Sequence, residues 1–128
     1  MIFVDTNYFL RFLLKDIGSQ YQEAKNLFLL AGKGEEELIS STVVFFEVFW
    51  VLRSTYGKDK QTLVEILDKL LKLNIEFDKH QLLVSSVHLF AEANLSLEDC
   101  YNLTFAREQN VKSFRTFDLK LAKEFRTG

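Results

Sequence analysis

The sequence contains no proline, and among its 128 residues it has only one cysteine, Cys100, and two histidines, His80 and His88. A single cysteine cannot form a disulfide within the chain, and so few thiol and imidazole groups exclude a zinc site of the Cys/His type. Any metal ion would therefore be bound by oxygen ligands. We expect His80, His88 and Cys100 to be structural residues, with the Cys100 thiol buried.

Long hydrophobic runs are also missing. The longest, residues 42–52, is interrupted by Glu47, and it is shorter than the roughly 20 residues that a membrane-spanning helix needs. Met1 is followed directly by Ile2-Phe3-Val4, without the basic leader and small-residue cleavage site of a signal peptide. We therefore expect a cytoplasmic protein that does not bind membranes.

What the chain does contain is typical of one globular domain. Hydrophobic residues make up 48% and charged residues 27% of the sequence, a balance that allows a single core and argues against disorder. No linker or repeat divides the chain, so we predict a single domain over residues 1–128. The net charge is −2, which means that a polyanionic substrate would need local basic groups or bound cations.

Apolar runs at residues 1–4, 38–41, 74–77 and 112–117 predict four short strands. Helical spacing predicts helices at 7–14, 19–32, 42–56, 59–71, 78–93, from 96 and from 118, with Ser19, Asp59, Asp78, Ser96 and Asp118 at their starts. Strands that alternate with pairs of helices favour a mainly parallel sheet covered on both faces, because parallel neighbours need crossover connections. The predicted fold class is α/β, a three-layer α/β/α sandwich.

Glu47 is the only carboxylate among the ten mostly apolar residues from Val43 to Leu52. A helix that is apolar on every side is normally buried, and a buried carboxylate has to be neutralised, paired or bound to a metal ion. Arg53 does not have the spacing that would make it a partner within the helix. The alternative to a metal ligand is an ion pair with another basic residue.

Three aspartates stand where ligands of a parallel sheet are expected. Asp5 and Asp118 directly follow predicted strands, and Asp99 begins a helix. Each has a structural alternative as a helix cap or turn residue, and Ser96-x-x-Asp99 is itself a capping box. If all three lay beside Glu47, their charges would repel one another unless a cation sat among them. A hard divalent ion, Mg²⁺ or Mn²⁺, suits such ligands and supports phosphodiester hydrolysis.

Four motifs together resemble the acidic motifs of PIN-domain nucleases, above all the toxins of VapBC-type toxin–antitoxin pairs. They are Val4-Asp5-Thr6-Asn7, Glu47, Leu95-Ser96-x-x-Asp99 and Arg115-Thr116-Phe117-Asp118, and they span nearly the whole chain. The resemblance implies that Asp5, Glu47, Asp99 and Asp118 are catalytic and hold one or two Mg²⁺ or Mn²⁺ ions, while Asn7 and Thr116 orient carboxylates and water. It further implies an endonuclease that cleaves RNA, an antitoxin partner, and a sheet of four or five strands.

Candidate RNA contacts are Arg11, Arg115 and Lys120, which lie near the acidic motifs; the alternative is that they are ordinary solvated charges. Phe45, Phe46, Phe49 and Trp50 supply more aromatic surface than one sheet face can cover. The neighbouring helix, with Leu63 to Leu71, is the simplest cover. A homodimer or an antitoxin segment laid in a groove is the alternative.

Other functions remain open at this point. A receiver-type phosphoacceptor would have an acidic neighbour beside Asp5, and a haloacid-dehalogenase-like phosphatase would have an aspartate in place of Asn7. Phosphorylation of an aspartate by a small phosphodonor would favour either of them. Two alternatives within the PIN resemblance also remain: an RNA-processing nuclease that is not a toxin, and a PIN-like module that binds RNA or protein without cleaving it.

Overall fold

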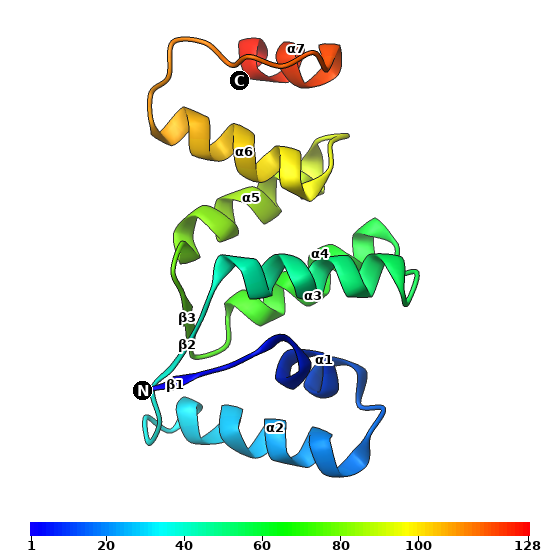
Figure 1. Ribbon diagram of the computed structural model, residues 1–128, viewed down its shortest axis with the longest axis vertical. Coiled ribbons are helices and arrows are strands. Elements are labelled where there is room, and N and C mark those ends of the chain that lie inside the picture. Colours follow the sequence, from blue (N-terminus) through cyan, green and yellow to red (C-terminus); the bar gives the residue numbers. More distant parts are fainter. The chain divides into compact units, whose positions relative to one another are not determined.

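The computed structural model describes residues 1–128, which divide into a first unit, Met1–His80, and a second unit, Gln81–Gly128. The first unit contains β1 (Ile2–Phe3), α1 (Thr6–Leu14), α2 (Gly18–Gly32), β2 (Leu38–Ser40), α3 (Thr42–Ser54), α4 (Lys60–Leu71) and β3 (Ile75–Phe77) (Figure 1). Helix α5 (His80–Glu92) begins at the boundary, and α6 (Leu97–Glu108) and α7 (Leu119–Thr127) follow in the second unit. No helix combines the length and hydrophobicity that crossing a bilayer would require.

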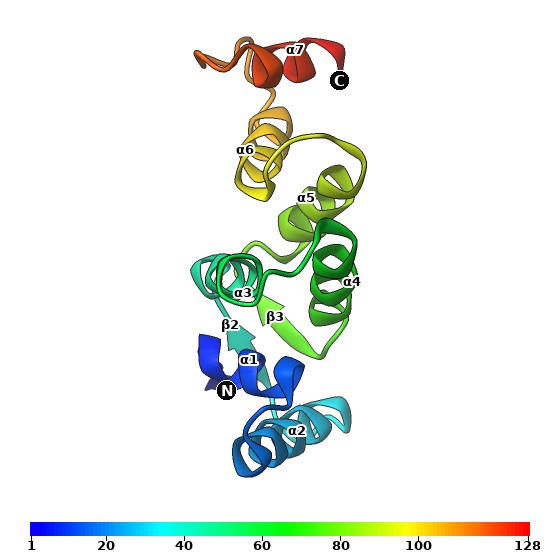
Figure 2. The same ribbon diagram turned by 90° about the vertical axis from the view of Figure 1, so that its right-hand side faces the viewer.

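The strands form one parallel sheet in the order β1-β2-β3 (Figure 1), with Ile2 opposite Leu38 and Leu38 opposite Ile75. This confirms the predicted α/β class. Strands β2 and β3 can also be followed in Figure 2. The fourth predicted strand, residues 112–117, is wrong, because this segment is neither strand nor helix. A strand needs a neighbour for its backbone groups, and an apolar run does not by itself supply one; here Phe114 packs on Phe125 of α7 instead, with ring centroids 5.5 Å apart.

One face of the sheet carries the core of the first unit. Val4, Leu38, Ser40, Ile75 and Phe77 are buried and, by register, point to the same side. The ring of Phe77 lies 5.8 Å from that of Phe9 on α1 and 5.6 Å from that of Phe45 on α3, so both helices pack on this face. Phe3 and Glu76, whose side chains point to the other face, are exposed. A second covering layer stays a prediction.

The helix starts were predicted with mixed success. Asp59, Ser96 and Asp118 cap α4, α6 and α7 as expected. Ser19 lies inside α2, whose N-cap is Ile17. Helix α5 begins at His80, two residues after Asp78, and Asp78 Oδ1 accepts hydrogen bonds from the amide (2.6 Å) and hydroxyl (2.8 Å) of Thr42 on α3. Sequence spacing identifies local caps, whereas a cap supplied across the sheet depends on the tertiary fold.

Two of the three residues expected to be structural, Cys100 and His80, have structural environments. Cys100 is buried in α6. The Nδ1 atom of His80 accepts from the amide of Phe77 at 3.3 Å, and Nε2 lies 3.0 Å from the carbonyl oxygen of Leu71, so His80 links the end of α4 to β3. His88 is exposed on α5.

Candidate metal centre

Asp5 directly follows the buried Val4 at the carboxyl end of β1 and occupies the N-cap position of α1. Its side chain accepts no capping hydrogen bond, and no ion pair involves it. The Asp5 side chain therefore does not cap α1, which was the structural alternative to a role as a metal ligand. An exposed carboxylate without a protein partner at this edge of a parallel sheet is available to a ligand.

Glu47 lies in the second turn of α3, and its predicted burial is wrong because the side chain is exposed. The helix buries only one side, with Val44, Phe45, Val48, Phe49 and Leu52. The exposed stripe contains Val43 (69% exposed), Glu47 and Trp50 (55% exposed), so this helix leaves apolar as well as acidic side chains uncovered. No basic residue pairs with Glu47, which removes the ion-pair alternative.

Asp99 and Asp118 differ in how far their local structure uses them. Ser96 Oγ accepts from the Asp99 amide at 3.1 Å, but the Asp99 carboxylate makes no return bond, so the capping box is only half formed. Asp118 Oδ1 accepts from the amides of Lys120 (3.0 Å) and Leu121 (3.1 Å) at the start of α7. The capping bonds leave Oδ2 of Asp118 without a partner.

Of the predicted supporting residues, Thr116 is engaged and Asn7 is exposed. The amide of Asp118 donates to Thr116 Oγ1 at 3.0 Å, which fixes the backbone of the aspartate. The four acids are distributed between the units, Asp5 and Glu47 in the first, Asp99 and Asp118 in the second. In neither unit do three or more carboxylate, imidazole or thiol groups form a cluster that could hold a metal ion. The convergence of all four carboxylates stays a prediction.

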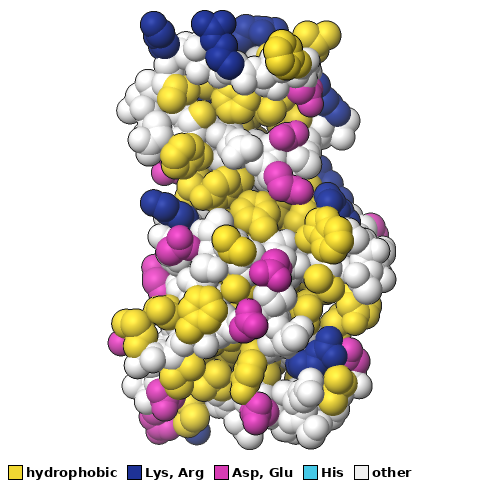
Figure 3. All heavy atoms as spheres, in the orientation of Figure 1, with side chains coloured by type: hydrophobic (Ala, Val, Ile, Leu, Met, Phe, Trp, Pro, Cys, Tyr) yellow, Lys and Arg dark blue, Asp and Glu magenta, His cyan; other side chains and the backbone are white.

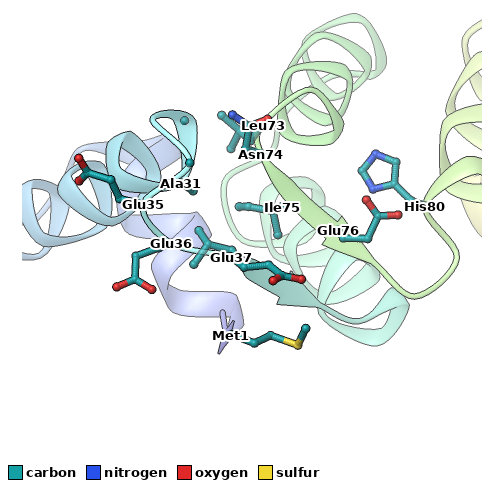
Figure 4. A pocket seen from close by; sticks show the side chains of 13 residues that line it. Met1, Ala31, Glu35, Glu36, Glu37, Leu73, Asn74, Ile75, Glu76 and His80 are labelled. Carbon is teal, nitrogen blue, oxygen red and sulfur yellow. The ribbon is translucent and has the colours of Figure 1, made fainter.

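A cavity of about 910 Å³ belongs to the opposite edge of the sheet, at the amino ends of the strands (Figure 4). Glu35, Glu36, Glu37 and Glu76 line it, and Figure 4 shows the first three pointing in different directions. Carboxylates that diverge do not form a cation site, and their charge repels a polyanion. This cavity does not contribute to the candidate metal centre.

Basic side chains gather over α7 (Figure 3). Residues 112–126 contain Lys112, Arg115, Lys120, Lys123 and Arg126, against only Asp118 and Glu124. Arg115 and Lys120 are the RNA contacts predicted from the sequence in this segment. Lys123 was not among them, although its spacing from Lys120 places it on the same side of a helix. Arg11, the remaining candidate, pairs with Asp16 at 3.2 Å.

The fold is that of a parallel α/β protein, and its candidate metal ligands are all carboxylates. The sequence matches the PIN domain family over residues 2–124, and the chain belongs to that family. Membership implies a hydrolytic nuclease acting on nucleic acids, and PIN domains generally use divalent metal ions. The receiver-type and dehalogenase-like alternatives are thereby set aside. No curated protein and no solved structure matches the chain significantly.

Proposed function

We propose that this protein is a Mg²⁺- or Mn²⁺-dependent ribonuclease that acts in the cytoplasm as the toxin of a toxin–antitoxin pair. The observation that best supports this chemistry is that, in a PIN domain, the carboxylates at the acidic motif positions have few partners within the protein. The carboxylate groups of Asp5, Glu47 and Asp99 have no hydrogen-bond or ionic partner in the protein, and the carboxylate of Asp118 uses one oxygen only. A ligand set requires carboxylate oxygens without protein partners, and each of the four motif positions offers at least one; helix capping accounts for one oxygen of Asp118 and for none of the other three carboxylates.

The donor chemistry of these residues fits a hard divalent cation, because every candidate ligand atom is a carboxylate oxygen. Such an ion, when bound, supplies an activated water at neutral pH and neutralises charge on the phosphoryl group. The protein's own part is to hold the ligands. Thr116 Oγ1 holds the backbone amide of Asp118, and the two amides that bind Asp118 Oδ1 restrict the side chain so that Oδ2 is the oxygen left for a ligand.

RNA is the proposed substrate, and the basic residues of 112–126 are its proposed backbone contacts. The whole chain carries a net charge of −2, so attraction has to come from a local group of cations. Replacing Lys120 or Lys123 with Ala should weaken RNA binding and lower the slope of log K against log salt by about 0.7 for each phosphate of a single strand that is no longer neutralised. Lys69→Ala on α4 is the matched control; equal slopes in all proteins would refute these contacts.

A decisive experiment follows RNA cleavage by the purified protein with Mn²⁺ and with EDTA. We expect cleavage only with Mn²⁺, and its loss in Asp5→Asn. Asp59→Asn is the control, because Asp59 is an exposed helix-capping aspartate outside the acidic motifs, and asparagine caps equally well. Cleavage that survives both EDTA and Asp5→Asn would overturn the proposal.

For the biological role, we propose a homodimer and an antitoxin partner. The exposed Val43 and Trp50 on α3 support an interface, since exposed apolar side chains grouped on one helix stripe mark such surfaces. Light scattering of the wild type and Trp50→Glu tests the dimer; a monomeric wild type at high concentration would refute it. Growth arrest on expression, absent with Asp5→Asn, tests the toxin role.

A further inference from the structure

A smaller cavity of the first unit, about 240 Å³, lies where α1 and α2 face each other. Asn7, Tyr8, Arg11, Gln20 and Glu23 line it, and all five side chains carry polar groups. Asn7 and Tyr8 belong to the first turn of α1, directly after Asp5. Two residues that line the cavity therefore lie within three positions of a proposed metal ligand in the sequence.

Glu23 is the acceptor of this cavity, and it is held in place. The Tyr8 hydroxyl donates to Glu23 Oε2 over 2.6 Å, an interaction that raises the pKa of Tyr8 and keeps the phenol protonated. One carboxylate oxygen is thus oriented by the tyrosine, and Oε1 remains available to a donor from outside. A short contact between two helices that fixes an exposed carboxylate is a feature of a preorganised polar pocket.

Arg11 supplies the complementary donors. One terminal nitrogen pairs with Asp16 at 3.2 Å, while Nε is buried and has no hydrogen-bond partner. A buried donor without a partner is unfavourable, so an acceptor that reached the Arg11 guanidinium would be favoured. The positive charge of Arg11 also reduces the repulsion between the negative charge of Glu23 and an approaching polyanion.

Size and chemistry together suit one nucleobase. The volume, about 240 Å³, is below the roughly 300–1,000 Å³ of pockets for drug-sized ligands. Single-stranded RNA is read mainly through splayed bases that hydrogen-bond along their edges and stack on aromatic or guanidinium planes. Donors from Arg11, Asn7 and Gln20 and an acceptor from Glu23 match such an edge.

We propose that this cavity binds one base of the RNA beside the cleaved bond, and that Glu23 selects a base with an amino group, cytosine over uracil. The inference rests on the proposed function, since it assumes an RNA substrate. Carboxylates accept from the N4 amino group of cytosine. Uracil presents a carbonyl oxygen at that position, which a carboxylate repels. Tyr8 is a positioning residue that acts through Glu23.

The test compares fluorescently labelled oligo(C) and oligo(U) of equal length, which differ in the amino and carbonyl groups but not in ring size. Binding is measured by anisotropy in EDTA, so that cleavage cannot contribute. The wild type should bind oligo(C) about tenfold more tightly, within the range of one well-placed base contact. Glu23→Gln should abolish the preference, since an amide accepts and donates, and Tyr8→Phe should reduce it. Salt dependence should stay unchanged, because Glu23 contacts no phosphate.

The matched control is Glu65→Gln, which removes an exposed carboxylate from α4 and should keep the full preference. Thermal melts of each variant establish that the fold is intact. Equal affinity of the wild type for both oligomers, or a preference that survives Glu23→Gln, would overturn this inference while leaving ribonuclease activity untouched. A wild type that binds neither RNA would also overturn this inference, whereas the proposed function is tested separately by cleavage with Mn²⁺.

Discussion

Asp5 and Asp118 both occupy the N-cap position of a helix, yet only the Asp118 side chain caps its helix. Asp118 accepts two amide hydrogen bonds at the start of α7, whereas Asp5, at the N-cap of α1, accepts none. Asp78 extends the comparison, because it follows β3 as Asp5 follows β1 but binds Thr42 through two hydrogen bonds. The hydrogen bonds of the fold account for the position of the Asp78 carboxylate and for one oxygen of Asp118. They give the Asp5 carboxylate no structural role.

The largest effect is expected at Asp5. Asp5→Ala should reduce RNA cleavage by roughly 100-fold or more, since even residues that only support metal ligands contribute 10–100-fold. The free energy of unfolding should change by less than about 0.5 kcal/mol, because the side chain makes no bond within the protein. Initial cleavage rates and urea unfolding measure the two quantities. A marked loss of stability with activity retained would show that Asp5 is a structural residue and not a metal ligand.

Metal binding should sharpen the same comparison. With Mn²⁺ at about 100 times its dissociation constant, the wild type should gain about 2.7 kcal/mol of stability. Asp5→Asn should lose most of that gain, and Asp59→Asn should keep it. Thermal denaturation with and without Mn²⁺ provides the measurement, and an equal shift in all three proteins would show that Asp5 is not a ligand.

Asp118 should show two separable effects. Asp118→Ala removes the cap of α7 and should cost about 0.5–2 kcal/mol, whereas Asp118→Asn preserves the cap and should cost little. Both should lower cleavage, since both remove the anionic oxygen that capping leaves uncommitted. Unfolding curves and cleavage rates of the two variants, compared side by side, make this distinction. Normal cleavage by Asp118→Asn would reduce the residue to a cap.

The smallest effect concerns Asp78 and pH. Burial raises its pKa, but hydrogen bonds from the Thr42 hydroxyl and amide outweigh this, so its pKa lies below the usual 3.8. Its contribution to stability is therefore present above the unfolded-state value and is lost as the pH falls through the lower folded-state value. Urea unfolding of the wild type and Asp78→Asn from neutral to acid pH tests this. Parallel pH profiles would contradict it.

The sequence predicted those features that depend on local order. Apolar periodicity located α1, α3 and α4, and the capping residues Asp59, Ser96 and Asp118 marked helix starts correctly. The four acids were found as motif positions, which the family match supports only at the level of a nuclease. These patterns are readable because hydrogen bonds and helix faces repeat over a few residues.

Other expectations failed because they concern partners distant in the chain. The segment 112–117 has an apolar pattern but no strand beside it. Glu47 was expected to be buried from the composition of its helix, but burial depends on how many sides of that helix are covered. The Tyr8–Glu23 bond joins residues on different helices, and nothing in the local sequence predicts it.

By itself, then, the order of residues determined most of the secondary structure and the parallel α/β class and supplied the candidate acidic positions, since short-range spacing and side-chain chemistry carry that information. Tertiary structure alone decided which carboxylates accept hydrogen bonds from distant parts of the chain. Asp78 is bound by a helix that begins 36 residues earlier, Glu23 by a tyrosine of the preceding helix, and Asp5 by neither. Hydrogen bonds act only over a few ångströms, so which side chains remain available for a ligand depends on packing that brings distant segments together.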